Sequence, residues 1–184
     1  MRLVTPRLTL RRFRAEDAPA FAAYRSDPQV ARYQTWTAPV PLTAAAELVQ
    51  EYATGDPQVP GWFQYAVELT DEHTLIGDVG VDMADNLMQV EIGFSLATAY
   101  QGQGYGSEAV RRIIEELFAE RGLHRISAEC DARNTSSARL LERVGFRREG
   151  YLVSNTWLKG EWTDDLLFGL LAEDWAAARR DGSG

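Results

Sequence analysis

Three closely spaced glycines stand between a strand-like run and an amphipathic helix. They belong to the segment Gln101-Gly102-Gln103-Gly104-Tyr105-Gly106-Ser107, which leads directly into the helix. Such a loop can bind an anion, because backbone N–H groups point out of it and the helix dipole adds roughly half a positive charge at the N-terminus. The glycines would also let the main chain approach a phosphate closely. We therefore expect a phosphate-bearing cofactor at this loop.

The spacing of the glycines separates this loop from two common phosphate-binding motifs. A Walker loop needs Gly-Lys-Ser/Thr after its second glycine, and the triplet Gly104-Tyr105-Gly106 has no lysine. A dinucleotide fingerprint needs G-x-G-x-x-G, whereas the glycines here follow G-x-G-x-G. A plain strand-to-helix connection is the alternative that the loop alone leaves open.

A single carboxylate is the second candidate for chemistry. Glu91 is the one charged residue in the run Val90 to Leu96, which ends just before the glycine loop. A glutamate in apolar surroundings beside a cofactor is placed to act as a general base. The alternative is a structural carboxylate that bonds the main chain or positions a substrate.

The elements that must position these residues follow from the hydrophobic pattern. The helix after the loop carries apolar residues with three-four spacing at Ala109, Val110, Ile113, Ile114, Leu117 and Phe118. Further helices are expected at Ala15–Arg25, Pro28–Tyr33, Thr43–Tyr52 (capped by Thr43), Asn134–Val144 and Glu173–Arg180. Strands are expected at Leu8–Phe13, Phe63–Leu69, Leu75–Met83, Val90–Leu96, Leu123–Asp131, Phe146–Trp157 and Glu161–Leu171. This order predicts one α/β (α+β) domain with a mixed sheet over residues 1–180 and a frayed tail at 181–184.

Composition excludes several classes of protein. The 19 basic and 27 acidic residues give a net charge of −8, which argues against nucleic-acid binding and favours cationic substrates such as amines. The sequence contains no run of 18 apolar residues, so no membrane span is expected. The N-terminus does not resemble a signal peptide. The single cysteine, Cys130, fits a reducing cytoplasm and a structural thiol. His73 and His124 lack partners at ligand spacing, so we expect no metal.

Six short motifs occur in an order that resembles the RimJ/RimL-type branch of the GCN5-related N-acetyltransferases (GNAT). They are Thr5-Pro6-Arg7-Leu8-Thr9-Leu10-Arg11 with Asp17, Glu91-Ile92-Gly93, the loop Gln101 to Gly106, Asn134-x-x-Ser137, Glu142-x-x-Gly145-Phe146 and Gly160-x-Trp162-x-Asp164. The resemblance covers nearly the whole chain. It implies a central mixed, mostly antiparallel sheet, flanked by helices and splayed open between the Glu91 strand and the Ile126 strand to hold acetyl-CoA.

The resemblance also implies roles for particular residues. Phe94, Ser95 and Leu96 would contribute main-chain contacts to the pantetheine arm, and Gln101 to Ser107 would hold the pyrophosphate. The amide of Asn134 suits the amide-rich pantetheine. Many relatives place a tyrosine proton donor seven residues after this asparagine, but here that position is Leu141. Ser137 is the hydroxyl that the pattern offers instead, and the alternative is that Ser136 or Ser137 caps a helix.

The reaction implied is direct transfer of an acetyl group from acetyl-CoA to a primary amine. Deprotonating a lysine amine at neutral pH costs roughly 4–5 kcal/mol and an α-amine about 1 kcal/mol, so a base such as Glu91 helps with either. The acceptor is a protein N-terminus or a small molecule, and a homodimer is left open. Aromatic residues that could line the acceptor groove include Tyr24, Tyr33, Trp36, Trp62, Tyr65 and Trp157. The alternative function is a non-catalytic acyl-CoA-binding module.

Overall fold

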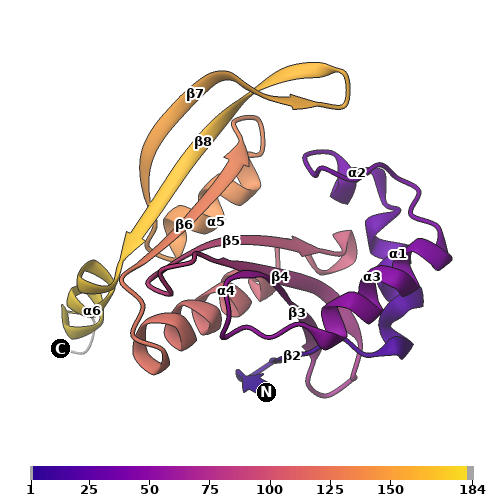
Figure 1. Ribbon diagram of the computed structural model, residues 1–184, viewed down its shortest axis with the longest axis horizontal. Coiled ribbons are helices and arrows are strands. Elements are labelled where there is room, and N and C mark those ends of the chain that lie inside the picture. Colours follow the sequence, from indigo (N-terminus) through magenta and orange to yellow (C-terminus); the bar gives the residue numbers. More distant parts are fainter. Residues whose placement is uncertain (1, 182–184) are drawn as a thin grey trace.

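The computed structural model describes residues 2–181, and its centre is one eight-stranded sheet (Figure 1). The strands run in the order β1-β2-β3-β4-β5-β6-β8-β7. Their bounds are β1 Arg2–Val4, β2 Leu8–Arg11, β3 Gly61–Leu69, β4 Leu75–Met83, β5 Gln89–Leu96, β6 Arg125–Asp131, β7 Arg147–Leu158 and β8 Glu161–Leu171. Neighbouring strands are antiparallel except β5 and β6, which are parallel. The prediction of a mixed, mostly antiparallel sheet flanked by helices is confirmed.

Helices cover the two faces of the sheet unequally. They are α1 Ala18–Arg25, α2 Pro28–Ala31, α3 Leu42–Thr54, α4 Tyr105–Glu115, α5 Thr135–Arg143 and α6 Ala172–Asp181. The apolar side of α4 packs with α5 on one face. The apolar residues predicted for this helix are all buried in the larger core cluster, and the last two of them, Leu117 and Phe118, lie in a π-helical turn, Glu116–Glu120, that continues α4. A smaller cluster lies between α1, α3 and the opposite face at β3. In Figure 1, α1 to α3 and the β7–β8 hairpin leave the rest of this second face uncovered.

Alternate residues of β3 to β6 point to this uncovered side, which we call the open face and define by Trp62, Gly80, Asp82, Glu91 and Glu129. The pairs Trp62–Asp82 and Asp82–Glu91 are in register across β3, β4 and β5. Registered partners point to the same side of a sheet, and residues two apart along a strand do so as well. The open face therefore carries polar and small residues opposite the apolar side that contacts α4.

The two parallel strands, β5 and β6, are paired over only part of their length and then separate. The ladder between β5 and β6 pairs Gln89 with Arg125, Val90 with Ile126 and Glu91 with Ser127, and then it stops. The remaining residues of both strands diverge around a cleft, which is lined by residues 92–94 of β5 and 128–131 of β6. The expected opening between these strands is confirmed.

Several local predictions were wrong or incomplete. The three-residue strand β1 was not expected, and β2 ends at Arg11 rather than Phe13. Helix α3 begins at Leu42 with Pro41 as its N-cap, so Thr43 is not the cap. Of the tail expected to fray, Asp181 is the last residue of α6, and positions 182–184 lie outside the described residues. No helix among the described residues is both long and apolar enough to cross a membrane.

Candidate active site

The glycine loop ends in a helix N-terminus that no side chain caps. Gly104 is the N-cap of α4 with φ +86°, and Gly102 has φ +73°, a backbone region that favours glycine. The first bond into the helix runs from the Glu108 N–H to the Gly104 carbonyl. The N–H groups of residues 105–107 precede this bond and have no intrahelical acceptor. A Cβ at Gly102 would meet no atom within 4 Å, so this part of the loop is open to a ligand.

The two glutamines of the loop hold its shape with their side chains. Gln101 Nε2 donates to the Leu96 carbonyl at 2.8 Å, and Gln103 Nε2 donates to the Ala99 carbonyl at the same distance. The two amides therefore tie the loop to the end of β5 and to the 3-10 turn Thr98–Tyr100 that follows it. Any contribution of these two residues to phosphate binding would come from their backbone N–H groups.

The cationic side chain of Arg7 lies beside the loop, although sequence reasoning did not place Arg7 in the site. Arg7 Nη1 donates to the Gln103 carbonyl at 3.1 Å, and Arg7 Nε donates to Glu108 at 2.6 Å. Its guanidinium also lies over the Tyr105 ring at 4.3 Å. Arg7 is about a hundred residues away in the chain, so spacing gave no signal that it reaches the loop.

The edge of β5 that faces the cleft has no strand partner beyond Glu91. Phe94, Ser95 and Leu96 pair with β4 on their other side, which fixes the backbone of this segment. An unpaired strand edge can hydrogen-bond an extended ligand as a further strand would. The Leu96 carbonyl already accepts from Gln101, so Phe94 and Ser95 are the freer of the three.

The helix opposite this edge brings the second group of predicted residues to the cleft. Asn134, Ser137 and Leu141 all line it. Asn134 is the N-cap of α5, because its Oδ1 accepts from the Ser137 N–H at 3.1 Å. The alternative that Ser136 or Ser137 caps this helix is therefore wrong. The Ser137 side chain is half-buried at the cleft wall.

The only cysteine in the chain also lines the cleft. Burial, followed by the nearby carboxylates Asp131 and Asp165, raises the pKa of the Cys130 thiol to about 11. The thiol is therefore protonated at neutral pH and a weak nucleophile. This agrees with the expectation of a structural thiol. Cys130 is therefore not an activated nucleophile that could accept the acetyl group.

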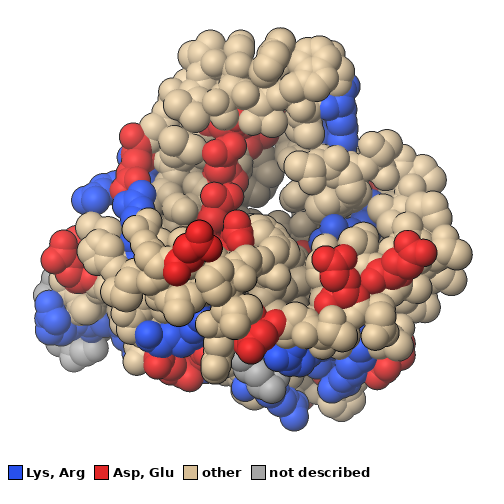
Figure 2. Space-filling model, in the orientation of Figure 1, with Lys and Arg blue, Asp and Glu red and all other residues tan. Residues whose placement is uncertain are grey.

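Glu91 lies on the open face where the ladder to β6 ends. Partial desolvation of its carboxylate and, second, the charge of Asp82 raise the pKa of Glu91. The pKa of Glu129 is raised as well, first by burial and then by Asp165 and Glu91. Asp and Glu side chains gather along the central hollow of the molecule in Figure 2. A carboxylate whose pKa is raised toward neutrality is a better proton acceptor than an ordinary one.

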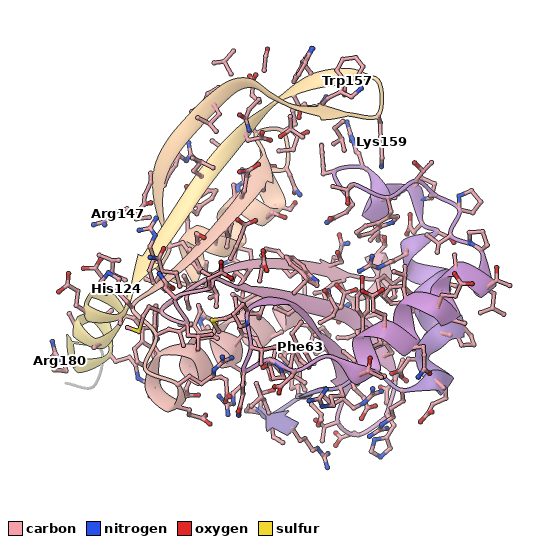
Figure 3. All side chains as sticks on the ribbon, in the orientation of Figure 1. Phe63, His124, Arg147, Trp157, Lys159 and Arg180 are labelled. Atoms are coloured by element: carbon pink, nitrogen blue, oxygen red, sulfur yellow. The ribbon has the colours of Figure 1, made fainter. Side chains whose placement is uncertain are left out.

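The β7–β8 turn closes over the far end of this hollow. Lys159 points from the turn toward α2 in Figure 3, and its Nζ lies 2.5 Å from the Ala31 carbonyl. Tyr33, two residues further on, lines the cleft below. No group of three or more His, Cys, Asp or Glu side chains in the described part of the chain is placed to hold a metal ion.

Removing the charge of Asp82 tests its influence on Glu91. In Asp82→Asn the pKa of Glu91 should fall, because a like charge that opposes ionisation is gone. If Glu91 is the base, its active form then persists to lower pH. We expect the acidic limb of the kcat/KM profile to move to lower pH in Asp82→Asn. An unmoved limb would mean that a different group controls it.

A mixed sheet that splits between two parallel strands, with a glycine loop and an uncapped helix N-terminus beside the split, forms a site suited to an extended ligand that carries a phosphate group. Residues 7–147 match the family model of the acetyltransferase (GNAT) domain. The chain belongs to the GNAT acetyltransferase family and is an N-acetyltransferase.

Three known proteins illustrate the relationship. The chain is 35% identical to an uncharacterized N-acetyltransferase, p20, of Bacillus licheniformis, over 95% of this chain and 98% of that protein. It is 34% identical to the [ribosomal protein uS5]-alanine N-acetyltransferase of Escherichia coli, over 48% of this chain and 45% of that protein. A GNAT-family acetyltransferase structure from Bacillus anthracis has a TM-score of 0.86 at 29% identity and covers 94% of this chain and 99% of that one. The resemblance to RimJ/RimL-type enzymes is thereby confirmed.

Proposed function

We propose that this chain moves an acetyl group from acetyl-CoA directly to a primary amine, with acetyl-CoA in the cleft between β5 and β6 and the amine on the open face. The observation that carries the proposal is the unpaired edge of β5, which runs from the residue after Glu91 to Leu96, just before the glycine loop. One strand thus connects a candidate base to a phosphate-binding helix N-terminus. A pantetheine arm would extend along this edge, and the pyrophosphate would meet the N–H groups of residues 105–107.

The chemistry needs a neutral amine and a proton for the departing thiolate. Glu91 takes the proton of the amine, directly or through water, and the amine nitrogen then bonds to the acetyl carbon as the carbon–sulfur bond breaks. Ser137 hydrogen-bonds the thiolate, and the second proton, which the nitrogen loses as the amide forms, passes through water to the sulfur, because a serine hydroxyl is a poor acid. Asn134 contributes its Nδ2 to the pantetheine while its Oδ1 caps α5.

The relatives bear on the acceptor only in part. The Escherichia coli relative is named for acetylating an alanine of ribosomal protein uS5. For the present chain, the acceptor is an amine of either a peptide N-terminus or a small molecule. An acceptor panel of N-terminal peptides, polyamines and aminoglycosides, followed by release of free thiol from acetyl-CoA, tests this function. Saturable acetyl-CoA binding without thiol release for any amine would instead favour a non-catalytic acyl-CoA-binding module.

Ligand-dependent melting separates the proposed donor from other phosphate compounds. A ligand that binds only the native state adds about 2.7 kcal/mol of stability at a hundredfold excess over its dissociation constant. We expect acetyl-CoA to raise the melting temperature, and ATP and NAD to leave it unchanged. A shift with ATP and none with acetyl-CoA would contradict the donor assignment.

A further inference from the structure

One aromatic residue of the open face is held in place without being buried. Trp62 on β3 is 50% exposed, and its ring lies over Gly80 of β4. A Cβ at Gly80 would lie 2.2 Å from Cζ2 of the indole, so only glycine leaves room for the ring here. The tip of the ring reaches further, to within 3.7 Å of the Cβ position at Gly93 on β5. The indole therefore spans from its own strand across β4 to the strand that carries Glu91.

A chain of buried polar groups fixes the orientation of this ring. Trp62 Nε1 donates to Gln64 Oε1, and Gln64 Nε2 donates to Asp78 Oδ1, each at 2.5 Å. Asp78 is 1% exposed and also accepts from the Tyr24 hydroxyl and from Arg25 Nη2. The polar edge of the indole is thus satisfied inside the protein. Its apolar face is what remains for a ligand.

The tip of the ring lies at the place where donor and acceptor would meet. Gly93 lines the cleft between β5 and β6, two residues from Glu91. Trp62 pairs across strands with Asp82, and Asp82 pairs with Glu91. An amine that approaches Glu91 over the open face would therefore pass along the exposed face of Trp62.

Three carboxylates share the open face with the ring. Asp82, Glu91 and Glu129 have neither an ion pair nor a side-chain hydrogen bond among the described residues. Asp82 and Glu91 are in register on neighbouring strands, about 5 Å apart at the usual strand spacing, and Glu129 lies on β6 beyond the point where it separates from β5. One ammonium group can approach Glu91, and carboxylates remain on both sides. An aromatic face beside carboxylates is also a favourable surface for a cation and its methylene groups.

We propose that Trp62 is the residue that selects the acceptor, holding the carbon chain of an aliphatic amine with a second positive charge a few carbons from the reacting nitrogen. This inference rests on the proposed function for the location of the site. The indole face packs against the methylene groups, the reacting amine lies at Glu91, and the second ammonium lies near Asp82 or Glu129. A peptide N-terminus without such a charge would leave those carboxylates uncompensated.

A purely structural role for the indole predicts different results. An aromatic ring laid over a glycine can stabilise a sheet simply by covering the backbone. Under that role Trp62→Ala would lower the melting temperature and leave acceptor KM unchanged in the molecules that fold. Under the proposal, Trp62→Ala changes acceptor KM and leaves acetyl-CoA KM unchanged.

Two amines with the same four-carbon chain, one of which carries a second amino group, test the second charge without requiring turnover. The chain has five tryptophans, and the indole N–H signal of Trp62 is assigned by its loss in Trp62→Phe. With CoA present, we expect 1,4-diaminobutane to move this signal and 1-aminobutane to move it much less at the same concentration. The Trp175 signal, on α6, should stay in place as the internal control. If 1,4-diaminobutane does not move the Trp62 signal, or if both amines move it equally, the proposal is wrong.

Kinetics on the same pair of amines complete the test. We expect Trp62→Ala to raise the KM for 1,4-diaminobutane by about 3- to 30-fold, the range of a lost cation–aromatic contact. Trp62→Phe should retain most of the affinity, and Gly80→Ala, which displaces the ring, should behave like Trp62→Ala. Trp175→Phe is the matched control and should leave KM unchanged. An enzyme that acetylates N-terminal peptides but neither amine would refute the second-charge requirement while supporting the proposed acetyl transfer.

Discussion

Glu91→Gln is expected to lower kcat by about 10²–10⁴-fold while acetyl-CoA affinity stays near that of the unmodified protein. The amide keeps the size of the glutamate, but it cannot accept a proton from the attacking amine. Glu91 lies on the open face, outside the predicted donor contacts with the loop and the β5 edge. Steady-state rates with a saturating acceptor, together with acetyl-CoA titrations, measure the two effects separately.

The pH dependence identifies the role of the carboxylate. Partial desolvation and Asp82 raise the pKa of Glu91, so its basic form, and the rate, should be lost as pH falls through that raised pKa. In Glu91→Gln this acidic limb should disappear. The deficit should also shrink as pH rises, because a larger share of the acceptor amine is then already neutral. Profiles of kcat/KM from about pH 4, near the ordinary pKa of a glutamate, to about pH 9.5 would show both changes.

Glu129→Gln is the matched control, because it removes a carboxylate from the neighbouring strand of the same face. It should change the KM of a cationic acceptor and keep the acidic limb of kcat. A folded Glu91→Gln protein with the pH profile of the unmodified enzyme would remove Glu91 from the mechanism. Lower stability with unchanged activity per folded molecule would make it a structural carboxylate.

The parts of the fold that were predicted correctly depend on local patterns. The three-four spacing of α4 and the alternation of β3, β4 and β5 each follow from one buried face, so a short window of sequence is enough to detect them. The cap of α3 was misassigned to Thr43, and Ser136 or Ser137 was left open as the cap of α5, because more than one residue near the start of a helix can take the cap position. Which one does so depends on the backbone angle at which the chain enters the helix.

The candidate site was predicted where its residues are close in sequence and missed where they are not. Glu91 and the loop share one stretch, and the structure places them at two ends of the same strand edge. The sequence did not rank the aromatic candidates. In the structure Tyr65 is 1% exposed in the core, whereas Trp62, three residues earlier, is on the open face. Strand alternation puts the two residues on opposite faces of β3, and packing against α4 decides which face is buried. Arg7 reaches the loop through tertiary packing alone.

The motif residues Arg11 and Asp17 have a structural explanation rather than a catalytic one. Arg11 Nη1 and Nη2 donate to the two carboxylate oxygens of Asp17 at 2.7 and 2.8 Å, and Arg11 Nε donates to Glu68 at 2.7 Å. All three residues are buried, with 3–5% exposure. They join β2 and β3 to the chain segment that enters α1, the helix of Tyr24 and Arg25.

Arg11→Met should therefore lower the free energy of unfolding by about 3–5 kcal/mol, because it leaves two buried carboxylates without their cation. The sign of the pH dependence follows from Glu68. Burial, the largest single influence, would raise its pKa, but hydrogen bonding and charge from Arg11, together with His73 and Arg14, outweigh burial and lower it. In the unmodified protein, Glu68 thus contributes stability that is present above its unfolded pKa of about 4.3 and is lost as pH falls through the lower folded value. The deficit of Arg11→Met should consequently be largest at neutral pH and smaller in acid.

Arg14→Met provides the matched control, because Arg14 approaches the same Glu68 at 3.8 Å from a side chain that is 54% exposed. Because the Arg14 side of this pair is exposed to water, we expect the pair to contribute about 0–1 kcal/mol, so urea unfolding at pH 7 should separate the two variants clearly. Equal losses for both would show that Arg11 does not compensate the buried carboxylates. Because the ion triad holds α1 in place without touching the cleft, Arg11→Met should reduce the folded fraction while kcat per folded molecule is retained. A lower kcat in fully folded Arg11→Met would instead connect the triad to the site, through Tyr24, Arg25 and the orientation of Trp62.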